Sequence, residues 1–225
     1  LHLSSAASDV YKRQDLSAPL ARFCAENFRD LVFPYKRFAY GNVFRQEKAD
    51  SARFRSFAQL DADIIGDVNP SQADAEICNI ISESFKKIGL NKDQFTINVS
   101  NKKILQGLIN DLKIEQNKQY KVLKSIDKLD RLGIKGVEEL LKKGREDQSG
   151  AFTKGCDLSD NQVLEIINFL NLKEIKDLKF NLKNELSIEG INELEELFEV
   201  LSFGNNQDSI SIDVTKIRGL SYYTG

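Results

Sequence analysis

The segment from Arg53 to Asp63 alternates polar and apolar side chains, as a β-strand with two different faces does. Guanidinium groups suit phosphate oxygens, an aromatic ring can stack on a base, and an amide with carboxylates can hold an ammonium group. All these groups occur in that order on the odd-numbered face: Arg53, Arg55, Phe57, Gln59, Asp61 and Asp63. The pattern therefore predicts a strand face that binds a nucleotide triphosphate beside an amino acid.

The same polar face has an ordinary explanation. Antiparallel sheets commonly leave one polar face in solvent, with its charges paired to neighbours. The even-numbered side chains of 54–64 are mainly apolar and suit packing against helices. Arg45 and Glu47 alternate on the preceding strand and are expected near this face, but surface ion pairs of this kind contribute little energy. The pattern alone leaves both explanations open.

Apolar periodicity and turn residues predict the elements that position this strand. Two strands joined by a polar loop at 48–53 are expected to form an antiparallel hairpin. The expected strands are 36–47, 54–66, 94–100 and 209–214. The expected helices are 17–29, 71–87, 101–112, 118–132, 136–143, 159–171 and 188–202.

Composition narrows the class of protein. The chain has 225 residues, of which 41% are hydrophobic and 29% charged, and it carries a formal net charge of −2. This is a soluble globular composition, and no apolar run approaches the roughly 20 residues of a membrane span. The only histidine is His2, so the rest of the chain lacks the histidine that catalytic triads and zinc hydrolases usually use as base or metal ligand.

Charge distribution, cysteine spacing and the chain ends give further expectations. Residues 101–145 hold twelve Lys/Arg against six Asp/Glu, which fits either a solvated helical surface or a local contact with RNA. The three cysteines are scattered, so neither a zinc site nor a disulfide framework is expected, and reduced cytosolic thiols fit best. The chain has no methionine, and residues 1–14 read as a non-native leader. We expect truncation at both ends.

Three separated motifs resemble one protein family. Residues 40–63, YGNVFRQEKADSARFRSFAQLDAD, resemble motif 2 of class II aminoacyl-tRNA synthetases in its histidyl form. IRGLSYYTG at 217–225 is similar to the histidine-specific signature RGLDYYTG, and DLSAPLAR at 15–22 is similar to the DLTAPLAR segment before motif 2. Residues 122–133 and 150–162 resemble the family's helical insertion, so the likeness runs from residue 15 to the end.

The resemblance implies an α+β fold: a class II synthetase-type antiparallel sheet flanked by helices, with an α-helical insertion. It further implies a catalytic core over 15–117, the insertion over 118–205, and a return to the core over 206–225. The implied activity is that of a histidine–tRNA ligase, which joins histidine to ATP and transfers it to tRNA-His. ATP is then a substrate, Mg²⁺ a cofactor, and a cytoplasmic homodimer the expected assembly.

Family roles carry over to matching positions. The implied catalytic arginines are Arg45 and Arg218, which contact the α-phosphate. The implied ATP-binding residues are Arg45, Glu47, Arg53 and Phe57. The implied histidine-binding residues are Asp15, Ser17 and Gln59 at the amino group, with Asp63, Tyr222 and Tyr223 at the imidazole end.

The sequence departs from the family pattern at three places. Ser221 replaces the signature aspartate, the loop at 48–52 lacks the usual proline and basic residues, and Ala58 is smaller than usual. A rival interpretation is a synthetase-like regulatory subunit of ATP phosphoribosyltransferase, and another is a kinase-linked sensor of uncharged tRNA. Both tend to lose ATP-site arginines, so the retained arginines and the long insertion favour the synthetase.

Overall fold

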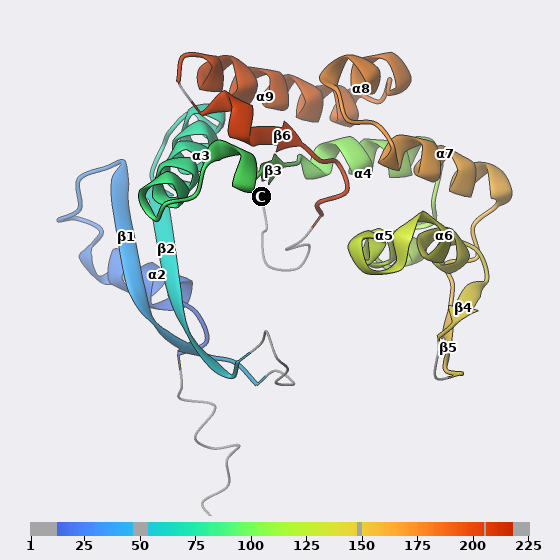
Figure 1. Ribbon diagram of the computed structural model, residues 1–225, viewed down its shortest axis with the longest axis horizontal. Helices are drawn as coiled ribbons and strands as arrows, with labels where there is room; N and C mark the ends of the chain where they lie inside the picture. The colour runs from blue at the N-terminus through green and yellow to red at the C-terminus, as the bar shows by residue number, and fades with distance from the viewer. Residues whose placement is uncertain (1–12, 47–53, 148–149, 205, 218–225) are drawn as a thin grey trace, which may run out of the picture. The chain divides into compact units, whose positions relative to one another are not determined.

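The computed structural model describes residues 13–46, 54–147, 150–204 and 206–217, and it divides into two compact units at Ala73 and Asp74. The first unit contains a helix and a long hairpin (Figure 1). Its elements are α2 (Ser17–Asn27), β1 (Tyr35–Phe44) and β2 (Ser56–Ile65). Among the described residues, no helix has both the length and the apolar character needed to cross a membrane.

The hairpin is antiparallel and pairs ten residues of each strand, from Tyr35 opposite Ile65 to Phe44 opposite Ser56. A further backbone hydrogen bond, from the Arg45 N–H to the Arg55 carbonyl (2.9 Å), continues the ladder towards the loop. Opposed residues share a face in such a pair. The odd-numbered residues of both strands therefore lie together, which confirms the predicted alternation for the described part of β2.

The short segment before α2 crosses the odd-numbered face. The Phe44 N–H donates to the Arg13 carbonyl (2.7 Å), so the backbone of this segment pairs with the end of β1. A Cβ atom added to Gly41 would meet the Leu16 side chain at 3.6 Å and the Arg13 guanidinium at 3.0 Å. Gly41 therefore lies beneath this segment, on the face that the segment crosses.

The even-numbered face carries exposed apolar side chains. It was predicted to pack against helices, but Phe38, Tyr40 and Leu60 are 81%, 75% and 64% exposed. The odd-numbered positions of β2 are the half-buried ones, because the segment at 13–16 covers their side. Within the first unit, no helix among the described residues covers these apolar side chains, and their packing against helices stays a prediction.

The second unit is mainly helical (Figure 1). Its helices are α3 (Pro70–Lys87), α4 (Lys102–Asp111), α5 (Gln116–Ile126), α6 (Leu129–Leu141), α7 (Asp160–Leu170), α8 (Ile175–Asn181) and α9 (Glu185–Ser202). Its strands are β3 (Ile97–Val99), β4 (Gly144–Glu146), β5 (Phe152–Lys154) and β6 (Ile210–Ile212). Two 3₁₀ turns complete it: η1 (Lys92–Gln94) and η2 (Gln207–Ser209).

Strands β3 and β6 pair in parallel, with Ile97 opposite Ile210 and Val99 opposite Ile212. The Asp213 N–H extends this ladder by donating to the Val99 carbonyl (2.9 Å). The chain therefore returns, after more than a hundred residues, to the strand from which it left. Helices α4 to α9 and the antiparallel pair β4–β5 lie between these two strands in the sequence.

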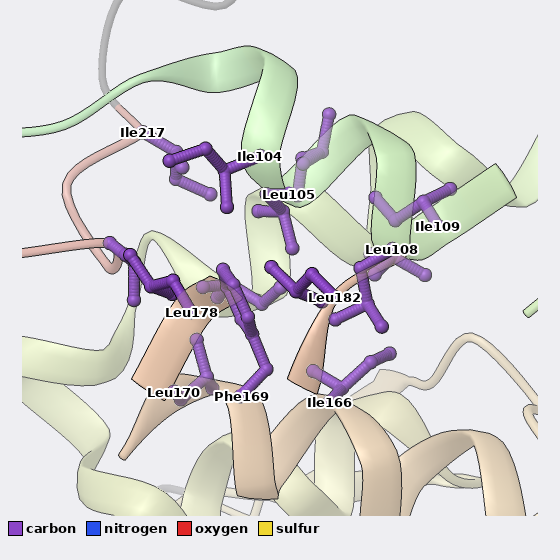
Figure 2. Close-up of a cluster of buried hydrophobic side chains, with 14 of the residues drawn as sticks. Ile104, Leu105, Leu108, Ile109, Ile166, Phe169, Leu170, Leu178, Leu182 and Ile217 are labelled. Atoms are coloured by element: carbon purple, nitrogen blue, oxygen red, sulfur yellow. The ribbon is translucent and has the colours of Figure 1, made fainter. Parts of the chain in front are cut away.

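One apolar core holds these helices together. Figure 2 shows side chains of α4 meeting those of α7 and α8: Ile104, Leu105, Leu108, Ile109, Ile166, Phe169, Leu170 and Leu178. Burial of each such side chain stabilises the fold by roughly 1.5–3 kcal/mol relative to exposure. Helix α9 adds Ile191, Leu194, Leu197 and Leu201, the stripe that its 3.6-residue periodicity predicts.

The expected and observed elements agree best where periodicity is long. Helices α3, α4, α7 and α9 begin and end within a few residues of the predicted ranges. The predicted helix at 118–132 instead ends at Ile126, and the predicted stop at Gly133 is a kink inside α6, with φ 66°. Helix α8 and the β4–β5 pair were not predicted, because segments of three to seven residues carry too little periodicity.

Candidate functional site

Arg45 lies on the polar face of the hairpin, directly after the last residue of β1. Its Nη2 donates to Gln59 Oε1 (3.2 Å), and its Nε donates to the Gln14 carbonyl (3.1 Å). Its guanidinium carbon also lies 5.1 Å from the centre of the Phe57 ring, a cation–π distance. These hydrogen bonds use two of the five N–H donors of an arginine, which leaves a planar cation with donors available to an anion.

Phe57 and Gln59 both contact the Arg45 guanidinium. The guanidinium covers one face of the Phe57 ring, so a nucleobase would stack on the opposite face. Gln59 Nε2 donates to Asp61 Oδ1 (2.7 Å) while its Oε1 accepts from Arg45. This network orients the amide, and it keeps an oxygen acceptor at the position expected to meet an ammonium group.

Asp63 forms an ion pair that the sequence analysis did not identify. Arg37 stands directly opposite it on β1, and Arg37 Nε donates to Asp63 Oδ2 at 3.0 Å. Only 20% and 23% of the two side chains are exposed, so the pair is partly removed from solvent. One signal could have revealed it: once Arg45 is placed opposite Arg55, antiparallel register puts Arg37 opposite Asp63.

Asp15 and Ser17 lie on the segment that crosses this same face. Asp15 Oδ1 accepts from the Ala18 N–H (2.9 Å) and so caps the first turn of α2. The backbone carbonyls beside Asp15 accept from the hairpin arginines: Gln14 from Arg45 and Leu16 from Arg37. The structure thus brings four predicted site residues to one strand face: Arg45, Phe57, Gln59 and Asp63. Asp15 and Ser17 adjoin it in sequence, because Gln14 and Leu16 accept from the arginines of that face.

The capping role of Asp15 can be separated from a ligand-binding role. Replacing Asp15 by alanine removes the cap and should lower the free energy of unfolding by about 1 kcal/mol, whereas asparagine keeps the cap acceptor. We therefore expect Asp15→Asn to retain stability but to bind an ammonium ligand more weakly, because it lacks the charge. Urea unfolding and ligand titration of both variants measure the two effects. Equal ligand affinity in wild type and Asp15→Asn would leave Asp15 with the capping role alone.

Five predicted site residues lie outside the described residues: Glu47, Arg53, Arg218, Tyr222 and Tyr223. The structure therefore does not test their proposed positions. Ile217, the last described residue, is buried in the core of the second unit. Within the described ranges, no cluster of three or more His, Cys, Asp or Glu side chains could hold a metal ion.

The basic stretch at 101–145 has two kinds of cation. Several lysines form ion pairs, among them Lys103 with Glu189 (2.7 Å) and Lys142 with Glu138 (3.0 Å), as on an ordinary charged helix surface. A cavity of about 530 Å³ in the second unit is lined by Lys128, Arg131 and Arg145, together with Leu132, Leu140, Asp147 and Thr153. Arg145 also forms an ion pair, with Glu139 (3.3 Å). The ion-paired lysines fit a solvated helical surface. A contact of the basic stretch with RNA stays a prediction.

Two of the three cysteines lie in the interior. The thiols of Cys78 and Cys156 are buried and free, and burial raises the pKa of each above its ordinary value. A raised pKa lowers the thiolate fraction and with it the reactivity.

The helices and small sheets described above make an α+β fold. It is similar to the crystal structure of histidyl-tRNA synthetase from Nostoc sp. PCC 7120, with a TM-score of 0.78 and 28% identity over 95% of this chain and 47% of that chain. The family model described as histidyl-tRNA synthetase matches residues 12–225. The chain therefore belongs to the histidyl-tRNA synthetase family.

Curated relatives agree with this family. The chain is 57% identical to the histidine–tRNA ligase of Pelagibacter ubique over 96% of this chain and 47% of the relative. It is 42% identical to the histidine–tRNA ligase of Bartonella bacilliformis over 95% of this chain and 45% of the relative. The chain thus spans about half the length of the curated relatives it matches.

A second solved structure shares the fold. It is described as an ATP phosphoribosyltransferase regulatory subunit/histidyl-tRNA synthetase from Bacillus halodurans C, and it matches with a TM-score of 0.75 and 22% identity. The match covers 95% of this chain and 52% of that chain. At this identity the likeness concerns the fold alone.

Proposed function

We propose that the full-length protein containing this chain is a histidine–tRNA ligase. The histidine carboxylate attacks the α-phosphorus of ATP, which releases pyrophosphate and forms histidyl-adenylate. The 3′-terminal ribose of tRNA-His then attacks the carbonyl carbon of the adenylate and releases AMP. The observation that carries this proposal is the set of contacts among Arg45, Phe57 and Gln59 on the strand face that also bears Asp63.

The first step needs no nucleophile from the protein. The enzyme has to align the carboxylate with the α-phosphorus and to stabilise the negative charge that grows on the phosphate oxygens. Arg45 is suited to that task, because two fixed contacts orient its guanidinium while other N–H donors are available. We assign Arg218 the same task, and Glu47 and Arg53 the nucleotide, from their matching motif positions.

Histidine would lie along the remainder of the face. Gln59 Oε1, Asp15 and Ser17 are proposed to meet the amino group, and Asp63 with Tyr222 and Tyr223 the imidazole end. An imidazole presents one N–H donor and one nitrogen acceptor. A pocket built on both bonds rejects apolar analogues strongly, since its own polar groups would be left unpaired.

Magnesium is proposed to enter with ATP, as part of the substrate. Mg²⁺ prefers carboxylate and water oxygens in octahedral geometry. On this face, Asp61 accepts from Gln59 and Asp63 accepts from Arg37.

The helical region is proposed to be an insertion in a catalytic core. The direct pairing of β3 with β6 supports this, because a chain that leaves and re-enters a sheet at neighbouring strands can accept a long excursion between them. We place the core at 15–117 and 206–225 and the insertion at 118–205. For the whole protein we propose a cytoplasmic homodimer that binds tRNA-His.

A regulatory subunit of ATP phosphoribosyltransferase is the second candidate. Its support is the likeness to the Bacillus halodurans structure, whose description names both functions. That structure is 22% identical, whereas the curated relative from Pelagibacter ubique is 57% identical. The presence of Arg45 in contact with Gln59 also favours a site that handles phosphate.

ATP–pyrophosphate exchange distinguishes the two candidates. A suitable protein is a chimera in which this chain replaces the matching 47% of the Pelagibacter ubique relative. We expect exchange that depends on histidine and on no other standard amino acid, followed by charging of tRNA-His transcripts. Histidine binding without exchange would support the regulatory subunit instead. The unaltered relative, assayed in parallel, shows that the preparation is competent.

A further inference from the structure

We propose that Arg37 is a positioning residue for histidine: it fixes the Asp63 carboxylate so that one oxygen points to the ligand, and it joins β1 to the segment that carries Asp15 and Ser17. This inference rests on the proposed function of the site. None of the motifs in the sequence includes Arg37 in a ligand-binding role.

The geometry of the ion pair carries the first part of the inference. Arg37 and Asp63 are cross-strand partners, and Arg37 Nε donates to Asp63 Oδ2 at 3.0 Å. Each carboxylate oxygen can accept two hydrogen bonds, so the contact fixes the plane of the group without filling it. Oδ1 then remains as the acceptor for an imidazole N–H. A carboxylate held from one side is preorganised for its ligand on the other.

A second contact extends the effect across the site. Arg37 Nη2 donates to the carbonyl of Leu16 at 3.0 Å, and Leu16 itself is buried. Leu16 lies between Asp15 and Ser17, the residues proposed to meet the amino group. The Arg37 guanidinium therefore connects β2, whose Asp63 is proposed to bind the imidazole, to the segment beside Asp15 and Ser17, which are proposed to bind the amino group. These two contacts set the spacing between the two parts of the site.

The partial burial of the pair makes the arrangement sensitive to its removal. Asp63 is about three-quarters covered, and taking away the partner of a buried charge leaves that charge uncompensated. The carboxylate would then turn to whatever donor or water it could reach. Lysine can replace the charge of Arg37 but not its fork of two separately directed N–H donors.

Steady-state pyrophosphate exchange in the chimera tests the role. We expect Arg37→Met to raise the KM for histidine about 10- to 100-fold, the range of a hydrogen bond to a charged group. The kcat and the KM for ATP should stay within about threefold of wild type. Arg37→Lys should recover part of the loss. Arg22→Met is the matched control, because Arg22 is an exposed arginine of α2 paired only with Glu26 in the described contacts.

Coupling to Asp63 is the sharper readout. In an Asp63→Asn background the oriented carboxylate is already lost, so adding Arg37→Met should change the histidine KM by less than about threefold. A full additional loss in that background would overturn the inference. So would an unchanged histidine KM in Arg37→Met, or an equal fall in affinity for histidine and ATP.

Two outcomes separate this inference from the proposed function. If the wild-type chimera shows no histidine-dependent exchange, the ligase proposal fails, and histidine titration by calorimetry still tests Arg37. If wild type is active and Arg37→Met behaves normally, only the present inference fails. Should Arg37→Met fold poorly, Arg37→Gln retains two N–H donors without the charge, and it should show the same selective rise in histidine KM.

Discussion

Arg45→Ala is expected to lower the kcat of histidine-dependent pyrophosphate exchange about 10²- to 10³-fold, as the loss of one preorganised donor to a developing charge does. The guanidinium is held by Gln14 and Gln59 and lies over Phe57, so it meets the phosphate without first being ordered. Its removal also leaves Gln59 with only its Asp61 contact, and a modest rise in the KM for histidine should follow.

Two companion variants make the Arg45 result interpretable. Arg45→Lys keeps the charge but offers no planar pair of donors, so its activity should fall between wild type and alanine. Arg22→Ala removes an exposed arginine of α2 and should leave exchange unchanged. The kcat and both KM values are measured for each protein. A kcat within about threefold of wild type in Arg45→Ala would remove Arg45 from the catalytic machinery.

Loss of Arg45 and loss of Arg37 are expected to change different kinetic constants. Arg45 acts where charge develops, so its loss appears mainly in kcat, whereas Arg37 acts on a carboxylate that meets the bound amino acid, so its loss appears in KM. The two lie on neighbouring parts of one strand face and share the covering segment through Gln14 and Leu16. A loss in kcat for the Arg45 variant and a rise in histidine KM for the Arg37 variant would show which part of the face serves the nucleotide and which the amino acid.

The sequence predicts the hairpin well because its signal is periodic. Alternation alone places Phe57, Gln59 and Asp63 on one face, and the register of β1 and β2 agrees. It does not reveal which face is covered. That depends on residues 13–16, whose contacts with Phe44, Arg45 and Arg37 run through backbone carbonyls and leave no trace in side-chain pattern.

Arg37 was missed for a related reason. A single arginine on a strand matches no motif. Its ion pair with Asp63 can be inferred only once the strand register is known. Motif resemblance favours residues that touch the substrate and passes over those that hold them in place. The β4–β5 pair and α8 escape prediction for another reason: elements of three to seven residues carry too little periodicity of their own.

Gly107→Ala should destabilise the helical unit. Helices α4 and α9 pack so closely that a Cβ at position 107 would lie 2.1 Å from Ser187 Oγ and 2.7 Å from the Ser187 backbone nitrogen. Ser187 Oγ meanwhile donates to the Ile104 carbonyl (3.0 Å), so it cannot turn away without losing a buried hydrogen bond. Overpacking of this kind costs about 1–3 kcal/mol. The melting temperature should fall by roughly 5–10 °C.

Gly204→Ala is the matched control, because its added Cβ would meet its nearest neighbour at an ordinary 3.5 Å. Thermal unfolding of the chimera, followed by circular dichroism, should show the control unchanged and Gly107→Ala destabilised. Adding Ser187→Gly should restore only part of the loss, since it removes the hydroxyl but not the backbone nitrogen. If Gly107→Ala has the melting temperature of wild type, helices α4 and α9 are not packed as closely as the contact between Gly107 and Ser187 requires.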